Sequence, residues 1–216
     1  MNRTTVHLLR HGKVHNPDQI LYGRLPDYHL SRSGRAMADA IAAHLARADV
    51  TYLAASPLER AQETAAPAAA ALGLPIVSDD RLIEAANDFE GKRVAVGDGA
   101  LRSPAAWPKL RNPFRPSWGE PYLGIALRML GAVYTAVDRA DGHEALLVSH
   151  QLPIWTVRRF LQGDRLWHNP TSRQCGLASL TSLHFVDGVL VDIAYSEPVG
   201  HLPATDDGVE AGQVEA

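Results

Sequence analysis

Residues 4–12 read Thr4-Thr5-Val6-His7-Leu8-Leu9-Arg10-His11-Gly12, and this short stretch decides the class of fold. The apolar and β-branched run from Thr4 to Leu9 predicts a buried strand, and the glycine after it predicts a tight turn. The strand end carries Arg10, whose planar guanidinium can hold an anion, and His11, whose imidazole can act as a nucleophile. Open α/β sheets place their functional residues at strand ends of this kind.

Further strands follow from two more apolar runs, residues 50–55 and 145–148, which are typical of strands buried in a parallel sheet. Near the end of the chain, segments 182–186 and 189–195 flank Asp187-Gly188, a dipeptide typical of a two-residue hairpin turn. Because helical patterns separate the first three strands, we predict an α/β fold. It should be a three-layer α/β/α sandwich with a mostly parallel sheet and an antiparallel hairpin at one edge.

Three helices can be placed by their sequence patterns. The first should run from Ser31 to about Ala48. The second should begin with Ser56 as its N-cap, Pro57 at the first helical position and Glu59 closing a capping box. The third should begin after Pro121. Its apolar stripe, which we expect to face the core, consists of Leu123, Leu127, Leu130, Tyr134 and Val137.

The length and composition indicate one ordinary globular domain. The chain has 216 residues, of which 46% are hydrophobic and 21% charged, and we assign residues 1–202 to a single domain. Residues 86–119 are rich in proline and aromatic residues, and we expect an irregular insertion that covers the site. Residues 203–216 are small, polar and acidic, which predicts a disordered tail.

Several classes of function and location are disfavoured by the sequence. A net charge of −3 argues against nucleic-acid binding, and no apolar stretch approaches the length of a membrane span. The single cysteine, Cys175, permits no intramolecular disulfide and should be inert packing, and the N-terminus lacks a signal-peptide pattern, so we expect a cytoplasmic protein. His7, His11 and His15 have a spacing that would suit a metal site on a helix, but they fall on a strand and its turn, so no metal site is predicted. The edge hairpin offers a surface for a homodimer.

Further residues complete a set of groups suited to phosphoryl transfer. Arg60, in the first turn of the helix after the second strand, can hold phosphate oxygens together with Arg10. His150, directly after the third strand, would add another positive donor if it is protonated. Glu84 can give a proton to the leaving oxygen and later take one from the attacking water, and Glu90 is its rival for that role.

This ordered set of motifs resembles the histidine phosphatase superfamily, the phosphoglycerate-mutase-like group. The matching segments are Leu9-Arg10-His11-Gly12, Leu30-Ser31-Arg32-Ser33-Gly34, Ser56-Pro57-Leu58-Glu59-Arg60-Ala61-Gln62-Glu63-Thr64-Ala65, Leu82-Ile83-Glu84, Phe89-Glu90-Gly91 and Val148-Ser149-His150. The resemblance implies a phosphohistidine at His11 and a proton donor at Glu84. It implies a phosphate pocket made of Arg10, Arg60 and His150. Further contacts with phosphate or substrate are expected from Asn16, Tyr22, Gly23 and Gln151.

Together these observations predict a metal-independent phosphatase that hydrolyses a small phosphorylated metabolite and needs no cofactor. Lys13 follows the Arg-His-Gly turn, Asn87 stands near the position of a mutase aromatic residue, and Arg111 and Arg115 are separated rather than paired. These departures weaken the hypothesis of a glycolytic mutase. Two alternatives stay open: a phosphoglycerate mutase that returns the phosphoryl group to its substrate, and a phospholigand-binding module without turnover.

Overall fold

The computed structural model describes residues 1–93 and 119–202, so most of the expected insertion and the whole expected tail lie outside the described residues. The strands are β1 (Arg3–Arg10), β2 (Val50–Ala55), β3 (Val77–Ser78), β4 (Glu144–Ser149), β5 (Leu180–Val186) and β6 (Val189–Ser196). The helices are α1 (Arg32–Leu45), α2 (Glu59–Leu72), α3 (Tyr122–Ala140) and α4 (Gln151–Leu161), with short 3₁₀ turns η1 (Asp80–Leu82) and η2 (Pro170–Ser172). Within these two ranges no helix combines the length and apolarity that a membrane crossing requires.

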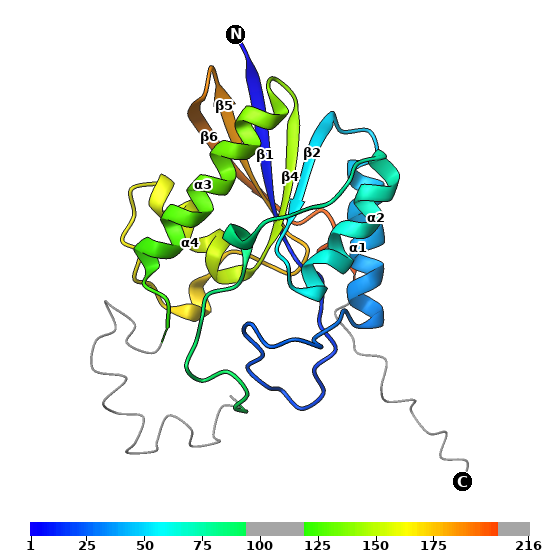
Figure 1. Ribbon diagram of the computed structural model, residues 1–216, viewed down its shortest axis with the longest axis vertical. Coiled ribbons are helices and arrows are strands. Elements are labelled where there is room, and N and C mark those ends of the chain that lie inside the picture. Colours follow the sequence, from blue (N-terminus) through cyan, green and yellow to red (C-terminus); the bar gives the residue numbers. More distant parts are fainter. Residues whose placement is uncertain (94–118, 203–216) are drawn as a thin grey trace.

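The strands form one open sheet in the order β3-β2-β4-β1-β5-β6 (Figure 1). The four strands from β3 to β1 run parallel, and β5 is antiparallel to both of its neighbours. The turn between β5 and β6 places Asp187 at φ 49° and Gly188 at φ 76°, as a two-residue turn of the predicted kind requires. The predicted α/β sandwich with an antiparallel edge hairpin is therefore confirmed.

Helices cover both faces of the sheet, with α1 and α2 on one side and α3 and α4 on the other (Figure 1). Side chains alternate along the strands, so neighbouring residues enter different cores. On β1, Leu9 packs in the cluster of α1 and α2, while Leu8 packs in the cluster of α3 and α4. On β4, Leu146 and Leu147 divide in the same way. These two buried layers hold the central strands rigidly, and with them the strand ends.

The predicted starts of α1 and α2 have different outcomes. The helix expected from Ser31 begins at Arg32, and Ser31 is its N-cap, because the Ser31 side chain accepts a hydrogen bond from the backbone N–H of Gly34. Helix α2 begins at Glu59, with Leu58 as an N-cap that makes no side-chain bond, so the predicted capping box at Ser56 is wrong. The Ser56 hydroxyl is completely buried and is used at the site described below.

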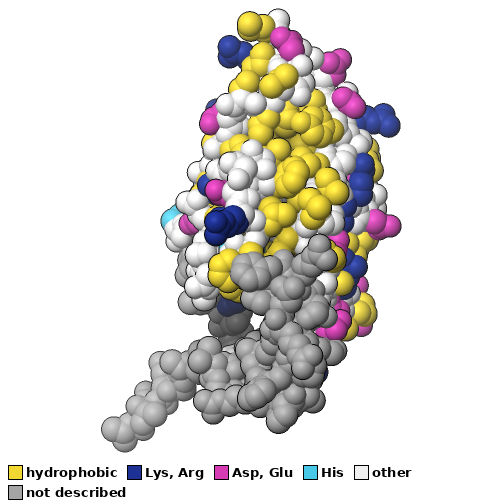
Figure 2. All heavy atoms as spheres, turned by 90° about the vertical axis from the view of Figure 1, so that its left-hand side faces the viewer, with side chains coloured by type: hydrophobic (Ala, Val, Ile, Leu, Met, Phe, Trp, Pro, Cys, Tyr) yellow, Lys and Arg dark blue, Asp and Glu magenta, His cyan; other side chains and the backbone are white. Residues whose placement is uncertain are grey.

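The prediction of which residues of α3 face the core is also largely wrong. Leu123, Leu127 and Tyr134 are about half exposed, with values of 53%, 56% and 45%. The core-facing side of α3 is made mainly of smaller residues and includes Ile125 and Met129, which are fully buried. Seen from the left-hand side of Figure 1, the molecule carries a band of hydrophobic side chains on its surface (Figure 2).

Candidate active site

The ends of three neighbouring parallel strands meet at one edge of the sheet. Arg10 at the end of β1 pairs with Ser149 at the end of β4, and β4 in turn pairs with the end of β2. The residues that follow β1 and β2 are still hydrogen-bonded to β4. The N–H of His11 donates to Ser149 O (3.1 Å), and the N–H of Ser56 donates to Val148 O (2.9 Å). The sheet therefore brings the predicted residues of β1 and β4 side by side.

His11 is held as a neutral imidazole. Its Nδ1 lies 2.8 Å from the carbonyl oxygen of Gly12, and since a carbonyl can only accept, Nδ1 carries the hydrogen. The lone pair is then on Nε2. The side chain is 2% exposed, and this burial, together with the positive charges of Arg10 and Arg60, lowers the pKa of His11 well below its usual value of 6.5. The ring is thus poised as a nucleophile at neutral pH.

The turn after His11 is held by close backbone packing. A Cβ atom on Gly12 would lie 2.6 Å from the carbonyl oxygen of Gly34 at the start of α1, so no larger residue fits there. The N–H of Gly12 donates to the Thr64 hydroxyl (3.1 Å), which itself donates to the carbonyl oxygen of Arg60 (2.7 Å). This chain of contacts fixes the nucleophile relative to the first turn of α2.

Two guanidinium groups, one fully buried and one partly buried, lie at this edge with donors to spare. Arg60 is fully buried, and its Nη2 donates to Gly23 O at 2.6 Å, while Nε and Nη1 have no partner among the described residues. Arg10 donates from Nη1 to Cys175 O at 2.7 Å, and its buried Nε has no partner there either. Buried donors are normally satisfied, so these nitrogens mark a site built for an oxyanion.

His150, the residue after β4, is the third predicted phosphate ligand. Its ring centre lies 5.1 Å from that of His11, and its Nε2 is 2.8 Å from the hydroxyl of Ser56. Burial, the proximity of the His11 ring and the charge of Arg60 lower the pKa of His150 well below 6.5. The expected positive donor is therefore a neutral imidazole here. Nδ1 of His150 is buried and has no partner in the part of the chain that the structure describes. If Ser56 donates to Nε2, this Nδ1 carries a hydrogen and can donate a hydrogen bond to an anion.

Glu84 supplies the carboxyl group of the cluster. It follows η1, and its Oε1 accepts a hydrogen bond from the N–H of Ala85 at 2.8 Å. Burial raises the pKa of Glu84 above its usual value of 4.5, against the opposing charges of Arg60, Arg10 and Arg173. This shift favours a protonated acid that can act as a donor.

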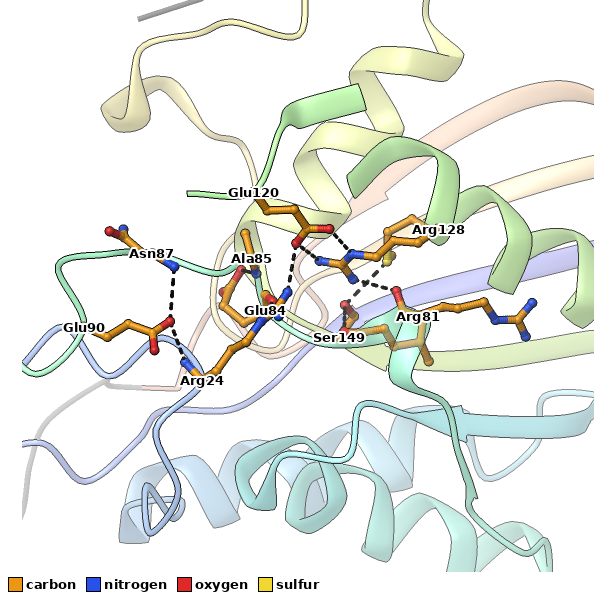
Figure 3. Close-up of polar contacts among 11 residues, drawn as sticks. Arg24, Arg81, Glu84, Ala85, Asn87, Glu90, Glu120, Arg128 and Ser149 are labelled. Carbon is orange, nitrogen blue, oxygen red and sulfur yellow. Dashed lines mark hydrogen bonds and ion pairs between the residues drawn. The ribbon is translucent and has the colours of Figure 1, made fainter. Parts of the chain in front are cut away.

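Glu90, the rival for the acid role, has a different function in the fold. Its Oε1 accepts the backbone N–H of Arg24 at 3.1 Å and that of Asn87 at 3.3 Å (Figure 3). Glu90 thus joins the loop after β1 to the segment after Glu84, so its carboxylate is occupied by the backbone. The geometry favours Glu84 as the acid.

The four expected substrate contacts divide into two groups. The ring of Tyr22 lies 4.8 Å from the Arg60 guanidinium carbon, and the carbonyl of Gly23 accepts from the same side chain. Gln151 shares the Cys175 carbonyl with Arg10, at 3.4 Å. Asn16 instead closes its own loop. Its amide nitrogen donates to Ile20 O (2.8 Å), and its amide oxygen accepts the Ile20 N–H (3.0 Å).

Arg173 is a further candidate for the site, which the sequence did not indicate. It is partly buried in the segment after η2, and its charge acts on Glu84 and Arg10. Its Nε donates to Nε2 of His168 at 2.8 Å, and His168 in turn donates from Nδ1 to Leu166 O at 2.7 Å. A lone arginine in an irregular segment has no motif around it, so no sequence signal points to this position.

The arrangement as a whole suits transfer of a phosphoryl group. It combines a neutral imidazole that can act as a nucleophile, two arginines whose spare donors have no partner within residues 1–93 and 119–202, a neutral histidine donor and a carboxyl group whose pKa is raised. Phosphoryl transfer depends mainly on positioning and on stabilising the charge of the phosphoryl oxygens, and these groups supply both. No group of three or more metal-ligating side chains occurs in the described ranges.

Comparisons with known proteins agree with this geometry. A family model described as the histidine phosphatase superfamily (branch 1) matches residues 6–192. Protein Rv0525 of Mycobacterium tuberculosis H37Rv is 58% identical over 195 residues, which cover 90% of this chain and 96% of that protein. The structure of YhfR from Bacillus stearothermophilus is similar with a TM-score of 0.78 and 27% identity, covering 93% of this chain and all of that one (100%). The mycobacterial glucosyl-3-phosphoglycerate phosphatase Rv2419c is similar with a TM-score of 0.69 and 25% identity, covering 84% and 90% of the two chains.

Proposed function

The chain belongs to the histidine phosphatase superfamily, and we propose that it is a phosphatase that hydrolyses a small phosphomonoester through a phosphohistidine on His11. The observation that carries this proposal is the hydrogen bond from His11 Nδ1 to Gly12 O. It leaves the Nε2 lone pair free in a ring whose pKa is lowered by Arg10 and Arg60. A neutral imidazole in a cationic pocket is the nucleophile that attack on a phosphate ester requires.

In the first half of the reaction, Nε2 of His11 attacks phosphorus and the ester bond to the leaving oxygen breaks. Arg10, Arg60 and the Nδ1 hydrogen of His150 hold the phosphoryl oxygens as their charge is redistributed. Glu84 gives its proton to the leaving oxygen, so that the product departs as a neutral alcohol. The enzyme is left with a phosphorylated His11 and an ionised Glu84.

In the second half, water releases the phosphoryl group. The carboxylate of Glu84 takes a proton from the water as its oxygen attacks phosphorus, and the bond to Nε2 of His11 breaks. Inorganic phosphate leaves, while Glu84 is protonated and His11 neutral again. All the charge needed is supplied by side chains, and we therefore propose that the reaction requires no metal or other cofactor.

Hydrolysis is favoured over phosphoryl return by the relatives and by the sequence. A glucosyl-3-phosphoglycerate phosphatase of mycobacteria shares the fold at 25% identity over 84% of this chain. The chain also lacks the paired arginines that the mutase group carries in its insertion, as Arg111 and Arg115 are apart. We propose a small phosphorylated metabolite as the substrate.

The test is release of inorganic phosphate from a panel of phosphorylated metabolites in the presence of EDTA. Wild type is compared with His11→Ala and with His15→Ala, a control on the same loop whose side chain is exposed. We expect release that survives EDTA, vanishes in His11→Ala and persists in His15→Ala, with an acid-labile phosphoenzyme trapped on quenching.

Four outcomes would contradict the proposal. Activity retained by His11→Ala would exclude the phosphohistidine, and loss of activity in EDTA would exclude the metal-free mechanism. Interconversion of phosphoglycerates that depends on a bisphosphorylated primer, with little net phosphate release, would identify a mutase. Binding of phosphorylated compounds with no turnover would identify a phospholigand-binding module.

A further inference from the structure

The segment that carries Glu84 is held by side chains of other elements. Beyond the short turn η1 it has no regular secondary structure, yet three of its carbonyl oxygens accept hydrogen bonds from distant side chains (Figure 3). Arg128 on α3 donates to Arg81 O (2.6 Å), Ser149 at the end of β4 to Leu82 O (2.7 Å), and Arg24 to Glu84 O (2.6 Å). The position of the acid is therefore set by tertiary contacts.

Among these donors, Arg24 alone acts on Glu84 itself, and its own orientation is fixed. Its Nε binds Glu84 O while its Nη2 binds Oε2 of Glu120 at 2.9 Å. Glu120 is held in turn by Arg128, whose Nε and Nη2 reach its two oxygens at 2.8 and 3.0 Å (Figure 3). Because a guanidinium is planar, two bonds from different nitrogens fix both the place and the tilt of the Arg24 side chain.

Arg24 is also the neighbour of a residue that positions the phosphate site. The carbonyl of Gly23 accepts the Nη2 hydrogen of Arg60, and the next residue along the chain holds the backbone of Glu84. One short piece of the loop after β1 thus contacts both the group that would grip the phosphate and the group that would protonate the leaving oxygen. The distance between these two groups depends on that piece.

We propose that Arg24 is a positioning residue, which holds Glu84 at the place where it can protonate the leaving oxygen, with Glu120 as the counter-ion that orients it. This inference rests on the proposed function, in which Glu84 is the acid. Arg24 touches neither the phosphoryl group nor the leaving oxygen and acts through the backbone of Glu84. Its removal should therefore impair the acid step and leave the phosphate site intact.

The leaving group of the substrate separates this role from a merely structural one. A p-nitrophenolate leaves without help from an acid, whereas an alkoxide needs its proton, so only alkyl phosphates report on the placement of Glu84. We expect Arg24→Gln to lower kcat/KM about 10- to 100-fold for a simple alkyl phosphate and less than about 3-fold for p-nitrophenyl phosphate. Arg93→Gln is the control, because Arg93 makes an exposed ion pair with Asp18, and neither substrate should be affected.

A double-mutant cycle tests whether Arg24 acts through Glu84. In a Glu84→Gln background the acid is already gone, so adding Arg24→Gln should change the alkyl phosphate rate by less than about 2-fold. Should Arg24→Gln fail to fold, Glu120→Gln provides the same measurement, since it removes the counter-ion and keeps the arginine. We expect Glu120→Gln to show the same preference for p-nitrophenyl phosphate, with a smaller loss.

Two results would overturn the inference: equal losses on the two substrates, or losses by Arg24→Gln that multiply with those of Glu84→Gln. Either result would show that Arg24 has only a structural role in the loop and does not position Glu84. Failure of the proposed function looks different. In that case Glu84→Gln alone would show no dependence on the leaving group, whatever Arg24→Gln does.

Discussion

At the scale of single residues, the proposed chemistry depends on two pKa values that are shifted in opposite directions. His11 must be neutral and Glu84 must be protonated at the same time. With their usual pKa values of 6.5 and 4.5, only about 1% of molecules would meet both conditions at the intermediate pH. Burial lowers the first value and raises the second, and the two required states then coexist over a wider range of pH.

These shifts predict the pH dependence of kcat/KM. The value of kcat/KM should rise with pH as His11 loses its proton, and the midpoint of this rise should lie below pH 6.5. It should fall again as Glu84 loses its proton, and the midpoint of this fall should lie above pH 4.5. The measurement is a pH profile of the wild type and of Glu84→Gln. The variant should lose the fall in kcat/KM at higher pH. Ionisation of the substrate affects both proteins equally, so the difference between the two profiles reports on Glu84. A flat profile from acidic to neutral pH would contradict the two roles.

The residues that the sequence predicts most directly are those at strand ends. Arg10, His11 and His150 follow directly from apolar runs, and the structure places them together at one edge of the sheet. Arg24 and Arg173 could not be predicted. Their roles depend on which irregular segments fold against them, and a local sequence pattern carries no information about such contacts.

At the scale of elements, the site depends on how closely the loop after β1 packs on α1. The N–H of Ser31 donates to Lys13 O at 2.9 Å, and Gly12 and Gly34 meet backbone to backbone. A Cβ atom on Gly34 would overlap the carbonyl oxygen of Lys13. Both glycines are thus needed for the close backbone contact between the turn after His11 and the start of α1.

Two helical glycines should respond oppositely to the same substitution. Gly34 is the third residue of α1 and Gly124 the third residue of α3, but a Cβ atom on Gly124 meets no described atom within 4 Å. Gly34→Ala should destabilise the fold by about 1–3 kcal/mol and lower kcat at least roughly 10-fold, by displacing the turn after His11. Gly124→Ala should stabilise it by up to about 1 kcal/mol with unchanged activity. Denaturant unfolding and steady-state kinetics measure both, and equal effects of the two variants would contradict this account.

The expected positions of strands and helices were largely confirmed, but the face of α3 was not. The sequence offers two apolar faces on this helix, one with large residues such as Leu127 and one rich in alanine. The alanine-rich face is buried because small side chains let the helix approach the sheet and α4 closely. The prediction from apolar positions gave most weight to large side chains, so it assigned the wrong face of α3 to the core.

At the scale of the whole molecule, the parallel part of the sheet gathers donors from distant parts of the chain into one cationic cluster. Arg10, Arg60 and His150 each bring buried nitrogens that have no partner among the described residues. The alternation of strands and helices predicted this class of fold, because parallel strands end at the same edge. The strand order was not predicted, since no local signal specifies which strands become neighbours. A homodimer through the edge hairpin stays a prediction.

An oxyanion bound by this cluster should stabilise the entire fold. An anion at a concentration 100 times its Kd contributes about 2.7 kcal/mol, which for a chain of this size corresponds to roughly 5–10 °C in Tm. Thermal melting with inorganic phosphate, against sodium chloride at equal ionic strength, measures the shift. Arg60→Gln should lose most of it. A shift of equal size with chloride, or one undiminished in the variant, would show that the anion binds elsewhere.

The burial of Cys175 has a practical consequence for labelling chemistry. This residue is the single cysteine of the chain, it is 2% exposed, and burial raises the pKa of its thiol to about 11. A cysteine introduced at Val189, which is 65% exposed at the hairpin turn, would therefore be the one readily alkylated thiol. In Figure 1 that turn lies at the end of the sheet opposite the carboxyl ends of β1, β2 and β4. A fluorophore or a solid support could be attached there, away from the candidate active site.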